Sequence, residues 1–102
     1  MIRCAAKKGT GEVRATFVVS GARLDGQRVA VVGDFNGWDP TATPMRKRGD
    51  GRVATVTVQA GRRYAFRYLC DDGTWFNDEA ADAYEPNGFG VDNSILDLAG
   101  AG

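Results

Sequence analysis

Hydrophobic and polar residues alternate with a period of two along several short segments, and turns rich in glycine separate these segments. No window of about twelve residues shows the apolar stripe of an amphipathic helix. The pattern therefore predicts an all-β chain of about seven or eight short strands, which is typical of an immunoglobulin-like antiparallel β-sandwich. The expected strands are 2–8, 12–20, 28–32, 45–48, 52–58, 62–70, 74–76 and 94–98.

The segment 62–70 shows the alternation most clearly, because its three aromatic residues are two positions apart. Successive side chains of a strand point to opposite faces of the sheet. Tyr64, Phe66 and Tyr68 are therefore expected on one face, and Arg67 is expected on the other.

The chain is expected to form one domain over residues 1–98, followed by a loose tail at 99–102, because its 102 residues suffice for a single hydrophobic core. The segment 77–90 is expected to be irregular. A loop of that length is uncommon in a compact domain and is often functional. Function is therefore expected near this segment.

Composition and charge exclude several classes of protein. Hydrophobic residues make up 43% of the chain and charged residues 25%, as in ordinary globular domains. The thirteen basic and thirteen acidic residues cancel, so we expect neither nucleic acid nor a membrane as partner. No signal peptide or long apolar run is apparent, which predicts a cytoplasmic protein with Cys4 and Cys70 as free thiols.

The sequence contains no histidine, which removes the commonest general base and a common metal ligand. Serine–histidine catalysis and histidine-bound zinc are thereby excluded. Acidic residues cluster between Asp71 and Glu85, but their spacing matches no calcium loop, and a solvated loop explains them better than a carboxylate pair. We therefore expect no catalytic residue, no metal and no cofactor.

The two tryptophans are candidate ligand-binding residues, because Trp38 and Trp75 lie in or beside turns. Flat indole rings suit the apolar faces of sugar rings, although position alone favours a structural role equally. Arg67 and Asn93 flank strands and offer hydrogen bonds to hydroxyl groups, but each by itself is more often a solvated surface residue.

Four segments occur in order along the chain: Val32-Gly33-Asp34-Phe35-Asn36-Gly37-Trp38, Tyr64-Ala65-Phe66-Arg67-Tyr68-Leu69, Asp72-Gly73-Thr74-Trp75-Phe76-Asn77-Asp78 and Pro86-Asn87-Gly88-Phe89-Gly90-Val91-Asp92-Asn93-Ser94-Ile95. Together they resemble a known family, the early-set or isoamylase N-terminal-like domains that form carbohydrate-binding module family 48. This family includes the glycogen-binding domain of the AMP-activated kinase beta subunit.

The resemblance implies an early-set β-sandwich that binds α-1,4-linked glucan. It implies that two tryptophans flank the sugar chain, that an apolar residue inserts against it, and that a basic residue and an asparagine bond to it. The matching positions are Trp38, Trp75, Phe89, Arg67 and Asn93.

The chain departs from the kinase subunit at two positions. Arg67 stands where lysine is usual, which changes the donor geometry, because a planar guanidinium and a point ammonium are not equivalent. Val91 stands where a ligand-bonding threonine occurs, which removes a hydroxyl group.

The leading hypothesis is a non-catalytic module that binds α-glucans such as glycogen, starch or maltooligosaccharides. The alternative is a protein-interaction or regulatory module that keeps the early-set fold and docks onto a glycogen-metabolising enzyme or kinase without binding sugar. Sequence alone does not decide between them, and it does not specify the oligomeric state.

Overall fold

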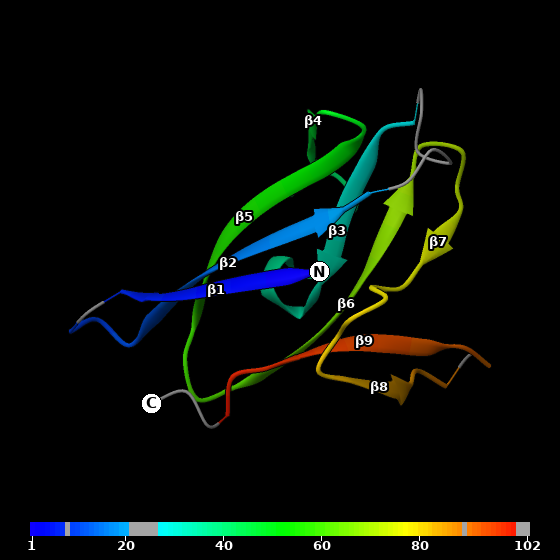
Figure 1. Ribbon diagram of the computed structural model, residues 1–102. Helices are drawn as coiled ribbons and strands as arrows, with labels where there is room; N and C mark the ends of the chain where they lie inside the picture. Colours follow the sequence, from blue (N-terminus) through cyan, green and yellow to red (C-terminus); the bar gives the residue numbers. More distant parts are fainter. Residues whose placement is uncertain (8, 21–26, 89, 100–102) are drawn as a thin grey trace.

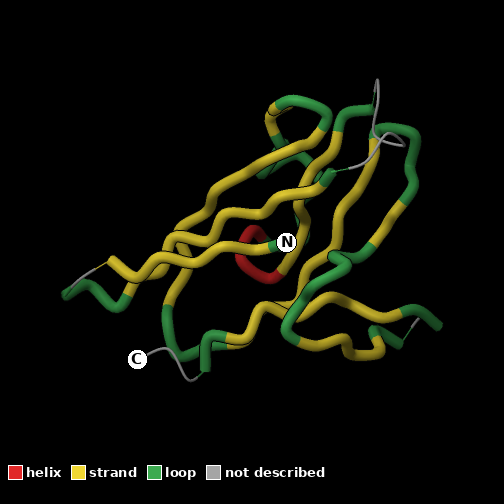
Figure 2. The backbone as a smooth tube through the Cα atoms, viewed as in Figure 1, coloured by secondary structure: helices red, strands yellow, loops and turns green. Residues whose placement is uncertain are grey.

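The computed structural model describes residues 1–7, 9–20, 27–88 and 90–99, which form two antiparallel sheets packed face to face (Figures 1 and 2). The predicted all-β sandwich is confirmed, with nine strands and one short 3₁₀ helix. The elements are β1 (Ile2–Lys7), β2 (Glu12–Val19), β3 (Val29–Gly33), η2 (Asp34–Asn36), β4 (Arg46–Arg48), β5 (Gly51–Gln59), β6 (Arg63–Cys70), β7 (Trp75–Phe76), β8 (Ala83–Pro86) and β9 (Asp92–Asp97).

Sheet A has the strand order β1-β2-β5-β4, and it contains the two hairpins β1–β2 and β4–β5. Sheet B has the order β3-β6-β9-β8, and β7 also pairs with β6. Residues that face each other in an antiparallel pair lie on the same face of the sheet. The registers therefore show which side chains of each sheet point toward the core and which point outward.

The core lies between the sheets and combines aliphatic side chains, valine most often, with a group of aromatic rings. Tyr64, Phe66 and Tyr68 on β6 are buried on the inner face of sheet B, as the alternation predicts. Phe17 on β2 contacts the Phe66 ring from sheet A, with 5.0 Å between ring centroids. This stack joins the two sheets and fixes which face of β6 points outward.

The helix η2 continues directly from β3 and is held by the Asn36 side chain, which confirms that the loop after β3 is structured. Asn36 Oδ1 accepts the Gly33 N–H at 3.0 Å, and Asn36 Nδ2 donates to the Val31 carbonyl at 3.0 Å. Phe35 turns inward and lies 5.4 Å from the Phe17 ring. The turn after β3 is thereby attached to the core.

The segment 77–90, predicted to be irregular, contains strand β8, so that prediction is wrong. Strand β8 pairs with β9 over Ala83–Pro86, and β9 begins at Asp92 rather than at residue 94. Its sequence, Ala-Tyr-Glu-Pro, shows little alternation, because this edge strand is mostly exposed and has no buried face to fill. Proline is tolerated in a strand at the edge of a sheet.

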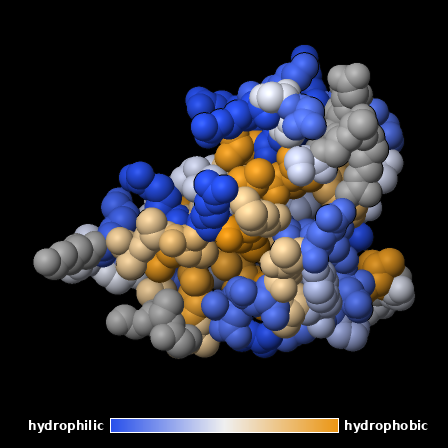
Figure 3. Space-filling view, in the orientation of Figure 1, coloured by the Kyte–Doolittle hydropathy of each residue, from blue (hydrophilic) through white to orange (hydrophobic). Residues whose placement is uncertain are grey.

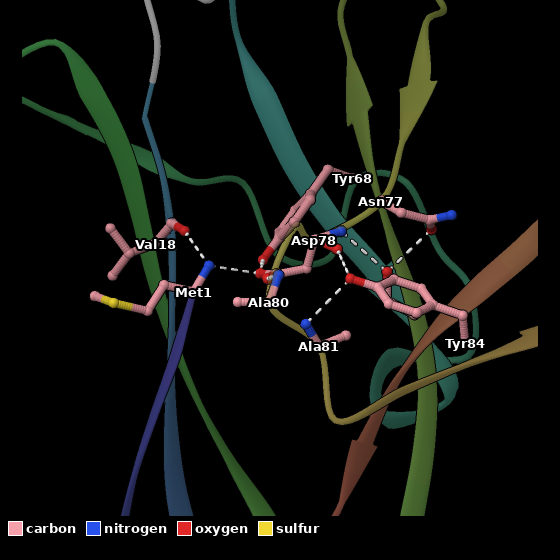
Figure 4. Close-up of polar contacts among 9 residues, drawn as sticks. Met1, Val18, Tyr68, Asn77, Asp78, Ala80, Ala81 and Tyr84 are labelled. Carbon is pink, nitrogen blue, oxygen red and sulfur yellow. Dashed lines mark hydrogen bonds and ion pairs between the residues drawn. The ribbon is translucent and has the colours of Figure 1, made fainter.

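Asp78 anchors the segment between β7 and β8, and its side chain is almost completely buried (Figure 4). Asp78 Oδ2 accepts hydrogen bonds from Tyr68 Oη at 2.6 Å and from the Met1 amine at 2.7 Å. The Asp78 N–H donates to Ser94 Oγ at 3.0 Å, and Tyr84 Oη donates to the Asp78 carbonyl. One residue thus connects Met1, which precedes β1, with β6, β8 and β9.

The electrostatics of Asp78 follow from these contacts. Burial alone would raise the pKa of this carboxyl, but the hydrogen bonds from the amine, Tyr68 and Ala80, with the charge of the amine, outweigh it. Its pKa therefore lies below the ordinary value of 3.8. Burial, then the bond to Asp78, raises the pKa of Tyr68, so Tyr68 is a neutral donor at ordinary pH.

Figure 3 shows hydrophilic residues at the β4 end of the molecule and hydrophobic ones toward its middle, near the N-terminus. Of the two free cysteines, Cys4 is exposed and Cys70 is buried. In the part of the chain that the structure describes, no helix is long and apolar enough to cross a bilayer. Residues 100–102 of the expected tail lie outside the described residues.

Replacing Gly33 with alanine is expected to destabilise the fold by about 2 kcal/mol, because the added carbon overpacks a well-packed site. A Cβ at Gly33 would lie 2.5 Å from the Ala65 carbonyl oxygen and 2.7 Å from the Phe66 Cβ. Urea unfolding measures the loss, with Ala30→Gly on the same strand as the control, expected to cost about 1 kcal/mol or less. Equal stability of Gly33→Ala and the native protein would contradict this packing.

Replacing Asp78 with asparagine is expected to lower the free energy of unfolding by about 2 kcal/mol at neutral pH, because hydrogen bonds to a charged group are lost. A carboxyl whose pKa is lowered by folding stabilises the fold above its unfolded pKa and stops doing so as pH falls through the folded value. The difference between the two proteins should therefore shrink below the ordinary value of 3.8.

Urea unfolding at pH 7, 5 and 3 checks this, with Asp71→Asn in an exposed turn as the matched control. A difference between native protein and Asp78→Asn that stays constant from pH 7 to pH 3 would show that the carboxylate does not carry the stabilisation.

Candidate functional site

Strand β6 changes its pairing partner at Arg67, which lies on the outer face of sheet B. On one edge of β6, β9 pairs as far as Phe66 opposite Ser94, and β7 begins at Tyr68 opposite Phe76. Figure 1 shows β7 and β9 following each other beside β6. Continuing each register by one residue brings Asn93 and Asn77 opposite Arg67.

Trp75 is on the same outer face, because it pairs with Leu69, two positions from Arg67. Its side chain is 41% exposed, whereas Phe76 beside it packs against the core. The Arg67 guanidinium carbon lies 5.8 Å from the centroid of the Trp75 ring, within the range of a cation–π contact. The structure thus brings together these two predicted site residues.

Trp38 lies beyond the end of β3 and is half-buried. Its Nε1–H donates to Asp34 Oδ1 at 2.8 Å, and Asp34 Oδ2 accepts the backbone N–H of Ala65 at 2.8 Å. Ala65 is two positions from Arg67 on the same strand and faces the same way. The Asp34 carboxylate thereby ties Trp38 to β6 near the outer face of sheet B.

Trp38 also has an unusual backbone conformation. Among the described residues it is the one non-glycine with positive φ, at 60°. Large side chains rarely adopt this conformation, and residues held in it cost of order 1–3 kcal/mol. Its N–H donates to the Gly33 carbonyl at 2.9 Å, which helps hold it there.

Asn93 is half-buried on β9, opposite Glu85 of β8. Asn93 Oδ1 accepts from Asn87 Nδ2 at 3.3 Å. Val91, at the position where the resemblance implies a threonine, is 44% exposed. Phe89 lies outside the described residues, so its predicted role stays a prediction.

Two further polar residues, Asn77 and Asp34, support the site and were given no role by the sequence analysis. Asn77 Oδ1 accepts from Arg67 Nε at 3.2 Å, and Asp34 connects Trp38 to β6. Both residues belong to the four segments that resemble the family, and this membership was the only sequence feature that pointed to them. Their roles depend on strand registers between residues far apart in sequence.

Among the described residues no further layer covers the outer face of sheet B, and Trp75 on it is exposed. A hollow of about 430 Å³ lies elsewhere, lined by residues that include Pro44, Arg46 and Thr55, and another of about 390 Å³ lies on sheet A beside Arg3 and Arg48. Neither is lined by the predicted site residues. Within the described residues, no group of three acidic or cysteine side chains is placed to hold a metal ion.

Charge is distributed unevenly despite a net charge of zero. The segment 71–97 contains eight of the thirteen acidic residues and none of the thirteen basic ones. This segment supplies β7 and β9, which pair with β6, and β8, which pairs with β9. Two of its carboxylates, those of Glu85 and Asp97, pair with the Arg63 guanidinium of β6 at 2.7 and 3.3 Å.

Comparison with known proteins identifies the family. A family model described as carbohydrate-binding module 48 (isoamylase N-terminal domain) matches residues 25–86. The 1,4-alpha-glucan branching enzyme GlgB 2 of Xanthomonas campestris pv. campestris (strain 8004) is 49% identical, over 46% of this chain and 7% of its own. The GlgB enzyme of Burkholderia pseudomallei (strain 668) is 37% identical, over 67% of this chain and 12% of its own.

This chain thus corresponds to 7% and 12% of the length of those two branching enzymes. The family model, in contrast, matches more than half of the chain, from β3 and its preceding residues to the end of β8. The two-sheet fold is consistent with that match. The chain is therefore a carbohydrate-binding module and belongs to the carbohydrate-binding module 48 family.

Proposed function

We propose that this module binds α-1,4-linked glucan chains of the glycogen, starch or maltooligosaccharide type on the outer face of sheet B. The contact between Arg67 and the exposed Trp75 ring carries the proposal, because it pairs an aromatic surface with a hydrogen-bond donor. Asn93 adds an amide on the same face. Stacking and hydroxyl contacts of this kind suit a neutral sugar polymer.

The openness of the face also supports a polymer ligand, since an extended chain can cross a surface without entering a pocket. The relatives named above are branching enzymes of 1,4-alpha-glucan, which favours that linkage among neutral polysaccharides.

The conformation of Trp38 supports a role for its ring in binding. Strained backbone conformations persist where the surrounding structure enforces them, and they concentrate at functional sites. Asp34 binds the indole N–H, which fixes the orientation of the ring while Trp38 remains partly exposed. In the proposed site, Trp38 and Trp75 stack on different sugar units, and Phe89 inserts against the sugar chain, as the family resemblance implies.

The module is proposed to act without catalysis, since it has no histidine and its proposed binding surface is an open face. A glycogen-metabolising enzyme or a kinase as docking partner stays a prediction of the sequence. A cytoplasmic location also stays a prediction.

Trp75→Ala is expected to weaken binding of maltoheptaose at least about tenfold, because the stacking surface is removed. Trp38→Ala should have a similar effect. The native dissociation constant is expected in the micromolar to millimolar range, since few contacts are fully desolvated. Titration calorimetry measures the affinities, with β-cyclodextrin as a second α-1,4-linked ligand and cellohexaose as a β-1,4-linked control.

Thr55→Ala on the outer face of sheet A is the matched control, because it removes a side-chain contact with Thr16 of the same sheet, on the side of the molecule away from the proposed site. It should leave the affinity for glucan unchanged. Native affinity in a folded Trp38→Ala/Trp75→Ala protein would disprove the proposed surface. Absence of saturable binding up to about 10 mM maltoheptaose would disprove glucan binding itself.

A further inference from the structure

Arg67 is held in one orientation by contacts on two sides. The Trp75 ring lies against its guanidinium at 5.8 Å, and Asn77 Oδ1 accepts its Nε–H at 3.2 Å. Neither Nη group of Arg67 bonds to another described residue. The edge of the guanidinium nearest the main chain is thus occupied, while the two terminal amino groups stay available.

Asn77 is itself held by β9, the other strand that pairs with β6. Its Oδ1 also accepts Ser94 Oγ at 3.0 Å, and its Nδ2 donates to the Asp92 carbonyl at 2.9 Å. These donors and acceptors use both ends of the carboxamide, so a rotated amide would place oxygen against oxygen at Asp92. The orientation of Asn77 is therefore determined before any ligand arrives.

The residue after Asn77 strengthens this arrangement. Asp78 Oδ2 accepts from Tyr68 in the interior and the Asp78 N–H donates to Ser94 Oγ, whereas the Asn77 side chain extends away from Asp78 (Figure 4). The backbone at this point is thus anchored from the interior. This anchoring keeps Asn77 in place to accept the Arg67 Nε–H.

From these contacts we infer that Asn77 is a positioning residue of the glucan site, which orients the Arg67 guanidinium as a fixed two-pronged donor. The inference rests on the proposed function. Two parallel N–H groups in one plane fit two neighbouring hydroxyls of one sugar ring, and prior orientation avoids the entropy cost of ordering the side chain on binding. A lysine ammonium has no such planar pair of donors and no Nε–H that Asn77 could hold. The proposed role of Asn77 therefore depends on arginine at position 67.

The test is a double-mutant cycle with maltoheptaose, measured by titration calorimetry on native protein, Asn77→Ala, Arg67→Ala and the double variant. Asn77→Ala is expected to weaken binding about fivefold, the effect of one typical hydrogen bond. In the Arg67→Ala background the same change should have almost no effect, because there is no guanidinium left to orient. The inference would be overturned if the losses of binding free energy in Asn77→Ala and Arg67→Ala added fully in the double variant. Additive losses are expected if Asn77→Ala only loosens the site in general.

A second measurement uses the native protein and does not depend on whether Asn77→Ala folds. Nuclear magnetic resonance of the Arg67 Nε–H should show slow solvent exchange before ligand is added, because Asn77 already accepts this proton. Rapid exchange in the ligand-free protein would overturn the inference. Thr55→Ala is again the control and should change neither the affinity nor this exchange rate.

The outcomes separate the two proposals. If native protein binds no maltoheptaose, the proposed function fails, and the positioning role in glucan binding fails with it. If native protein binds and the cycle is additive, the positioning role alone fails. If Asn77→Ala weakens binding in the native background but has no effect in the Arg67→Ala background, both proposals are supported.

Discussion

Strand β6 is the element on which both the core and the site depend. Its alternation places three aromatic rings inside and Arg67 outside, and the stack of Phe66 against Phe17 prevents a one-residue slip, which would exchange the two faces. The same strand runs between β3 on one edge and both β9 and β7 on the other. The change from β9 to β7 brings two asparagines to one arginine.

The segment after β7 shows how the interior determines the surface. Asn77 and Asp78 are adjacent, yet one binds Arg67 on the outer face and the other binds Tyr68 in the core. A buried carboxylate is costly unless hydrogen bonds satisfy it, and here they are numerous enough to keep its pKa low. The hydrogen bonds that hold Asp78 in the interior thus also hold the neighbouring Asn77 in place beside Arg67.

Much of the architecture could be predicted from the sequence, because period-two alternation reports directly on the two faces of a strand. The β1–β2 and β4–β5 hairpins and the inward rings of β6 followed from it. Strand β8 could not be predicted, since Ala83–Pro86 owes its strand conformation to pairing with β9 and has little alternation of its own. Trp38, Trp75, Arg67 and Asn93 were identifiable as candidates from residue type and motif, whereas the supporting roles of Asn77 and Asp34 were not.

The sequence by itself determined the all-β class, the aromatic face of β6, the family resemblance and the absence of histidine chemistry, because each depends on residue type or local spacing. The tertiary structure decided which distant residues meet. Arg67 and Asn77 are ten positions apart, and Asp34 and Ala65 thirty-one, and only the strand registers bring them within hydrogen-bonding distance. Local sequence carries no record of such pairings, since they arise when the sheets pack and each register buries its apolar face.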